Sequence, residues 1–159
     1  MPDYNILSIL KNYLFVSAVS AWFLAQVSKA LVNLCKKNRP KINNFFFGTG
    51  GMPSSHSAVV CALCTSAIFQ YGFMSFEFAI SGVLAVIVIR DATGVRFEAG
   101  EQAKFLNQII AERGEDETLP DKDAKFKELL GHTPLQVFFG SLLGVLVAVV
   151  YAIAYNYIL

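Results

Sequence analysis

The chain has 159 residues, of which 55% are hydrophobic and 16% are charged. This length fits one domain spanning residues 1–159, but the apolar content is too high for an ordinary soluble domain and indicates an integral membrane protein. The formal net charge of +1 gives no strong positive field, so no nucleic-acid partner is expected.

Four apolar segments in the chain predict transmembrane helices, at residues 13–34, 57–73, 76–89 and 135–159. A helix needs about 20 residues to cross a hydrocarbon core of about 30 Å. The second and third segments are shorter than this, and a tight turn marked by Gly72 and Glu77 separates them. We therefore predict an all-α integral membrane bundle of about four transmembrane helices.

A polar insert at about residues 90–131 separates the third and fourth segments. In its first part, apolar residues recur at helical spacing, at Val95, Ala99, Ala103, Leu106 and Ile110. The stretch that follows, ERGEDETLPDKDAKFK, is charged and contains glycine and proline, which is typical of a surface loop. We expect an extramembrane amphipathic helix followed by a loop.

The lysines and arginines of the chain gather after the first apolar segment and within the polar insert. The turn between the second and third segments has none, and neither has the C-terminus. The positive-inside rule then predicts a multi-pass protein whose basic loops lie on the cytoplasmic side, with both termini on the other side.

The only two histidines, His56 and His132, each open a predicted membrane helix on the basic side. Either Ser54 or Ser55 can cap the helix of the first, in the stretch GGMPSSHSAVV. In the second stretch, GHTPLQV, a threonine fit to cap the helix is followed by a proline suited to its first position.

Helix starts present unpaired N–H groups and partial positive charge, so these two helices, with Gly51, could cradle a phosphate. Charged donors could come from Lys29, Arg39 and Arg96. Each histidine alone could equally be a helix cap, and each basic residue a topology signal. Two histidines lack a carboxylate or thiolate partner at zinc spacing, so we expect neither a metal nor another cofactor.

Three motifs together resemble a known family. The stretch GTGGMPSSHSA is similar to the histidine-containing PSGH signature of the type 2 phosphatidic acid phosphatase (PAP2) superfamily, which includes vanadium haloperoxidases. The stretch LLGHTPLQVFFGSLLG resembles that superfamily's third motif. With RDATGVRFEAGEQAKFLN, the three resemble its divergent branch, over nearly all of the chain from about Gln26 onward.

The resemblance implies a phosphohistidine mechanism without a metal. His132 would attack phosphorus, while His56 would protonate the leaving oxygen and later deprotonate water. The equatorial oxygens would be stabilised by the N–H groups near Ser54 and Ser55 and by the cations Lys29, Arg39 and Arg96.

Three positions depart from the family pattern. Lys29 lies ten residues before Arg39, farther than usual, and Lys36 and Lys37 are alternatives. Phe126 occupies the position of the usual arginine before the nucleophile, so Arg96, or Lys125 and Lys127, must replace it. The acidic residue that would orient the nucleophile is Gln136, and Asp91 is a candidate to supply the missing charge.

The leading interpretation is therefore a membrane phosphatase acting on a lipid phosphomonoester or diphosphate, such as a phosphatidate or polyprenyl phosphate. The alternative is a non-catalytic membrane protein that binds lipid phosphate for transport or assembly. Vanadate-dependent halide oxidation fits less well, because it favours a wider, soluble pocket. The partners expected are a lipid phosphate and the membrane, and a homodimer is one option for the oligomeric state.

Overall fold

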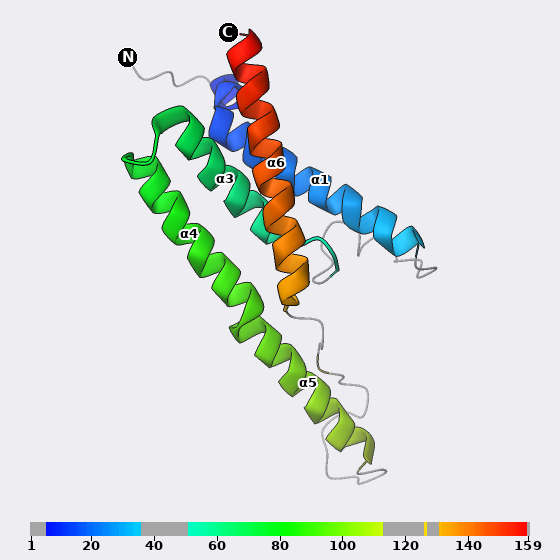
Figure 1. Cartoon of the computed structure of the whole chain (residues 1–159). Helices are drawn as coiled ribbons and strands as arrows, with labels where there is room; N and C mark the ends of the chain where they lie inside the picture. The colour runs from blue at the N-terminus through cyan, green and yellow to red at the C-terminus, as the bar shows by residue number, and fades with distance from the viewer. Residues whose placement is uncertain (1–5, 36–50, 113–125, 127–130, 159) are drawn as a thin grey trace.

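The computed structural model describes residues 6–35, 51–112, 126 and 131–158. A short 3-10 helix, η1 (Ile6–Lys11), precedes the first long helix. Figure 1 shows the helices that follow: α1 (Tyr13–Cys35), α3 (Ser55–Tyr71), α4 (Phe76–Thr93), α5 (Val95–Glu112) and α6 (Pro134–Ile158). The described residues form helices and no strands, which confirms the predicted all-α membrane bundle.

Three stretches of the described chain are long and apolar enough to cross a membrane: Tyr13–Asn33, Phe76–Glu112 and Pro134–Ala154. The predicted count of four spans is not confirmed, because α3 has only 17 residues. At about 1.5 Å per residue it is about 26 Å long, less than the hydrocarbon core of about 30 Å.

The short helix α3 nevertheless lies at the centre of the bundle, where it packs against α1, α4 and α6. Its buried residues are nearly all alanine or serine, whose small side chains let neighbouring helices approach closely. Ser17 of α1 and Ser66 of α3 are both fully buried, and their hydroxyl oxygens lie 2.6 Å apart. This hydrogen bond joins the two helices where no water can reach them.

Two glycines of α6 bring its backbone against the start of α3. A Cβ atom added at Gly140 would overlap the carbonyl oxygen of Ser54, and one added at Gly144 would overlap that of Ala58. Their G-x-x-x-G spacing places both on one face of the helix. Because of this close approach, the Ser54 N–H donates a hydrogen bond of 2.9 Å to the carbonyl of Gln136, which joins the starts of the two helices.

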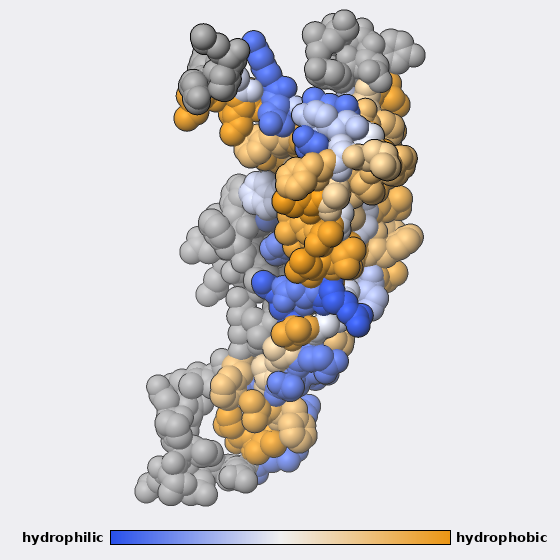
Figure 2. All heavy atoms as spheres, turned by 90° about the vertical axis from the view of Figure 1, so that its left-hand side faces the viewer, coloured by the Kyte–Doolittle hydropathy of each residue, from blue (hydrophilic) through white to orange (hydrophobic). Residues whose placement is uncertain are grey.

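Helix α5 continues the line of α4 away from the bundle, with Gly94 between them (Figure 1). The helix predicted in the polar insert is thus confirmed, although its position outside the membrane stays a prediction. Its predicted apolar face is buried only in part, since Ala103 is 7% exposed but Val95 is 74% exposed. Figure 2 shows apolar surface over α4, a hydrophilic band near the α4–α5 junction, and a second apolar area farther along α5.

Candidate functional site

The start of α3 is held by a serine cap. Ser54 is fully buried, and its Oγ accepts hydrogen bonds from the N–H of Ser57 at 3.4 Å and from the Ser57 hydroxyl at 3.0 Å. Gly51 has a φ of +94°, a conformation that side-chain-bearing residues rarely adopt. The cap confirms the prediction made for this stretch, and His56 becomes the second residue of the helix.

The start of α6 carries a capping box made by Thr133 and Gln136. The N–H of Thr133 donates to Gln136 Oε1 at 3.1 Å, and the N–H of Gln136 donates to Thr133 Oγ1 at 3.4 Å. The box therefore partners two of the backbone N–H groups at this helix start with side chains.

The same glutamine oxygen fixes the ring of His132. His132 Nδ1 lies 3.1 Å from Gln136 Oε1. The backbone N–H of Thr133 already identifies that atom as the acceptor oxygen of the amide, so Nδ1 must carry the proton. The other ring nitrogen, Nε2, is then left with its lone pair, which is the tautomer that a nucleophile requires.

His132 is also held through its backbone and through its neighbour. Its N–H donates a 3.0 Å hydrogen bond to the carbonyl of Ala92, in the last turn of α4. A Cβ atom added at Gly131 would overlap the backbone of Phe97, so α5 passes directly beside this loop. The residue is only 6% exposed as a result.

The structure brings the two histidines together although 76 positions separate them in the sequence. Their ring centroids are 6.2 Å apart and the ring planes make an angle of 51°. His56 is exposed, whereas His132 is buried. A nucleophile needs about 3–3.5 Å to its target atom and a general acid about 2.6–3.2 Å to its oxygen, so one phosphoryl group matches this separation.

Burial lowers the pKa of His132 below its ordinary value, and the hydrogen bond that its ring donates to Gln136 Oε1 opposes this in part. Positive charge on Lys29, His56 and Arg96 lowers the pKa further. Burial and the neighbouring positive charges both favour the neutral imidazole. The neutral imidazole keeps the Nε2 lone pair available.

Lys29 reaches the same region from α1. Its side chain is 8% exposed, and its Nζ donates a 3.1 Å hydrogen bond to the hydroxyl of Ser55. Among the residues that the structure describes, the ion pair joins Arg96 and Asp91, and no carboxylate pairs with Lys29. A buried ammonium inside a candidate span is costly and is usually functional.

Arg96 and Asp91 form an ion pair with each other on the surface near the α4–α5 junction. The Asp91 carboxylate therefore binds the guanidinium, and the hydrogen-bond partner of the His132 ring is Gln136. Arg39 lies outside the described residues, as do its neighbours Lys36 and Lys37 and the residues Lys125 and Lys127.

The family of the chain follows from comparison with known proteins. The model of the Divergent PAP2 family matches residues 10–147, which include both histidines. The chain belongs to this family. It is also 41% identical to the uncharacterized membrane protein YuiD of Bacillus subtilis (strain 168), over 92% of this chain and 98% of that protein. No solved structure is significantly similar to it.

The candidate site contains groups that sequence reasoning missed. The carbonyl of Ala92 and the hydroxyl of Ser57 help to hold the two helix starts, and Gly140 permits their approach. The G-x-x-x-G spacing on α6 was a readable signal of close packing. The role of a backbone carbonyl leaves no trace in a sequence. Among the described residues of this PAP2-family chain, no three His, Cys, Asp or Glu side chains are grouped to hold a metal ion.

Proposed function

We propose that this divergent PAP2 protein is a phosphatase that hydrolyses a lipid phosphomonoester or diphosphate through a phosphohistidine on His132. One observation carries the proposal: His132 and His56 have ring centroids 6.2 Å apart, beside the buried Lys29–Ser55 pair. A nucleophile, a proton donor and a cation then converge at one point, as phosphoryl transfer requires.

In the first step, the Nε2 lone pair of His132 attacks phosphorus, and the bond from phosphorus to the lipid oxygen breaks. The leaving oxygen takes a proton from His56, so that the lipid departs as a neutral alcohol or, from a diphosphate, as a monophosphate. The hydrogen bond from His132 Nδ1 to Gln136 supports this role, because it keeps the attacking nitrogen unprotonated.

In the second step, His56, which has lost its proton, accepts one from water as the water attacks the phosphohistidine. The bond between Nε2 and phosphorus breaks, and inorganic phosphate leaves. The exposure of His56 supports this role, since the attacking water must reach it from solvent. The two histidines return to their starting protonation states.

The charge that develops on the equatorial oxygens needs fixed donors. Lys29, with Ser55 beside it, is one, and N–H groups at the start of α3 near Ser54 and Ser55 are others, apart from the N–H of Ser54 itself, which donates to the Gln136 carbonyl. We assign the further cationic contacts to Arg39 and Arg96. For Arg96 this requires its guanidinium to leave Asp91 or to bridge the carboxylate and the phosphate.

The site belongs at a membrane boundary, because the phosphate of a lipid lies there while its chains lie in the core. We assign this boundary to the cytoplasmic side, on the basis of the lysines and arginines between the spans. A cysteine placed at Glu115 tests the assignment: an impermeant thiol reagent should label it only after the cells are opened.

A non-catalytic lipid-phosphate binder is the second candidate, and Gln136 is the observation that favours it. A neutral amide orients the imidazole but stabilises an imidazolium less than a carboxylate does. Such a protein would keep the phosphate pocket for transport or assembly without completing a turnover.

The deciding experiment is release of phosphate by the purified protein from a short-chain lipid phosphate, in the presence of a chelator. The phosphatase proposal predicts release, inhibition by vanadate, and loss of release in His132→Ala. The binding proposal predicts that no lipid phosphate tested releases phosphate, while vanadate or lipid phosphate still binds and His132→Ala weakens that binding.

A further inference from the structure

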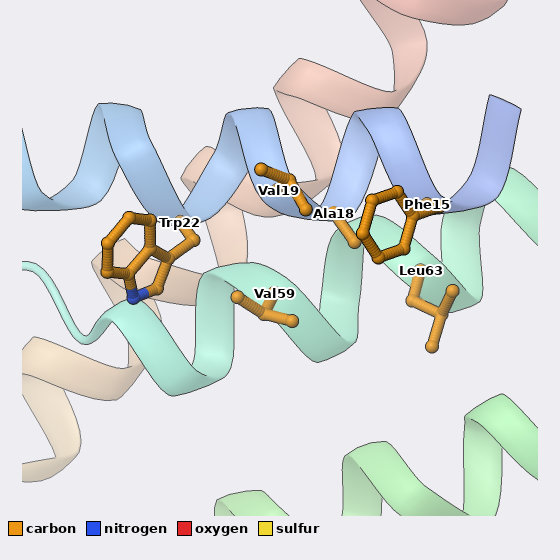
Figure 3. A pocket seen from close by; sticks show the side chains of 6 residues that line it. All are labelled: Phe15, Ala18, Val19, Trp22, Val59 and Leu63. Atoms are coloured by element: carbon orange, nitrogen blue, oxygen red, sulfur yellow. The ribbon is translucent and has the colours of Figure 1, made fainter. Parts of the chain in front are cut away.

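An apolar groove lies between α1 and α3, beside the candidate site. It has a volume of about 340 Å³ and is lined by Phe15, Ala18, Val19, Trp22, Val59 and Leu63. Figure 3 shows these side chains between the two helices, with Trp22 and Val59 toward one end and Phe15 and Leu63 toward the other. This volume falls in the range of about 300–1,000 Å³ that is typical of small-ligand sites.

The groove leads to the phosphate-binding groups. On α3, Val59 lies one turn after Ser55, so the two share a face of the helix. On α1, Lys29 lies seven residues after Trp22, again on the same face. The Lys29–Ser55 hydrogen bond of 3.1 Å therefore lies beyond the end of the groove at Trp22 and Val59, one helical turn farther along α3 and two along α1. From there the groove extends along α1 to Phe15, about 10 Å at about 1.5 Å per residue.

The groove is also open to the side. Phe15 is 44% exposed and Val19 is 45% exposed, although both belong to a candidate membrane span. Side chains exposed on such a span face lipid, so a hydrocarbon chain can enter from the bilayer without passing through water. Apart from the indole N–H of Trp22, none of the six lining side chains offers a hydrogen bond, which excludes a polar occupant.

We propose that this groove binds the hydrocarbon chain of the lipid phosphate whose headgroup lies between His56 and His132. The proposal rests on the proposed function, because it takes the phosphate site as the anchor of the ligand. The groove would then select substrates by the length and bulk of the chain, while the histidines and Lys29 act on the phosphate. Binding energy from the chain would hold the phosphate in position for attack.

The first test compares a long-chain with a dibutanoyl phosphatidate as substrates of the full-length protein in detergent micelles. Val59→Phe narrows the groove near its polar end. It should lower the ratio of kcat/KM for the long chain over the short chain about tenfold, the effect of excluding about two buried methylene groups. The matched control is Val86→Phe, at an exposed position of α4, which should leave the ratio unchanged.

The second test does not depend on turnover, and it uses the only tryptophan of the chain. A phosphonate analogue of phosphatidate with a brominated chain cannot be hydrolysed, and bromine quenches indole fluorescence on contact. The analogue should quench Trp22 more strongly than brominated phosphatidylcholine at the same mole fraction. Val59→Phe should remove this difference, and Val86→Phe should keep it.

The outcomes separate the two proposals. Equal quenching by both brominated lipids, or an unchanged chain-length ratio in Val59→Phe, would overturn the groove proposal even if phosphate is released. If no substrate is hydrolysed but the analogue quenches Trp22 preferentially and Val59→Phe abolishes the preference, the groove stands and the phosphatase proposal fails.

Discussion

The starts of α3 and α6 are built alike but hold their histidines differently. Both helices begin after a capping hydroxyl, Ser54 in one and Thr133 in the other. His132 precedes its cap, is buried, and is fixed by Gln136 and by the carbonyl of Ala92. His56 follows its cap by two residues and is exposed.

This difference fits a division of labour in phosphoryl transfer. A nucleophile must keep one orientation and one tautomer, so a fixed and buried ring suits it. A residue that gives a proton to one group and takes it from another must exchange with water, so an exposed ring suits it. Under the proposed function, similar helix starts would supply two unlike catalytic roles, and the variants below test that contrast.

The largest effect is expected at the fixed histidine. His132→Ala removes the proposed nucleophile, so phosphate release from a lipid phosphate should fall to the background rate. Circular dichroism and elution volume should match wild type, because His132 forms its structural contact through the backbone. Substantial residual turnover in a folded variant would assign the attack to another group.

A smaller loss is expected at the exposed histidine. His56→Ala should lower kcat by about 100-fold or more with a lipid phosphate, the usual scale for a general acid. With an aryl phosphate, whose leaving oxygen departs without a proton, the loss should be smaller. An equal loss with both substrates would mean that His56 has a role other than protonating the leaving group.

A smaller loss of turnover is expected when the two helix starts are pushed apart. Gly140→Ala adds a methyl group that overlaps the Ser54 carbonyl, so α3 must shift relative to α6. We expect turnover to fall about tenfold and the free energy of unfolding to fall by about 1–3 kcal/mol. The control is Gly82→Ala, whose methyl group would meet only the Cys64 sulfur at 3.9 Å, an ordinary contact. Equal effects of the two variants would contradict the role given to the close approach.

The smallest change in rate is expected from Gln136→Glu. A carboxylate beside Nδ1 should leave turnover equal or raise it severalfold, and it should raise the pKa of His132 by stabilising the imidazolium. In wild type the pKa of His132 is lowered from its ordinary value of 6.5, which favours the neutral ring. Turnover should therefore persist as the pH falls through 6.5. In the variant this acid limb should move to higher pH. A profile of kcat/KM against pH measures the shift, and an unmoved limb would mean that the limb belongs to another group.

Much of the fold could be predicted from hydrophobic patterning alone. The expected segment at residues 13–34 is the helix Tyr13–Cys35, and the one at 135–159 is Pro134–Ile158. The count of four spans could not be fixed in this way. Hydropathy does not distinguish a segment buried among other helices from one that crosses the membrane. Helix α3 packs against α1, α4 and α6 and is apolar for that reason, although it is short for a span.

The candidate site was predictable to the extent that it uses rare side chains at marked positions. With only two histidines, both at helix starts, their meeting could be foreseen. The ion-pair partner of Asp91 could not be foreseen. Arg96 lies five residues away on the next helix, and whether its side chain meets Asp91 depends on the turn at Gly94. Contacts made by backbone atoms, such as Ala92 to His132, were equally hidden.

The most direct test of the central claim is to trap the intermediate with a lipid phosphate labelled at its phosphorus. Wild type quenched in base during turnover should carry a label that is stable in base, is lost in acid, and maps to the peptide containing His132. His56→Ala should still form the label, and His132→Ala should form none. Phosphate release at the wild-type rate without a label on His132 would contradict the account.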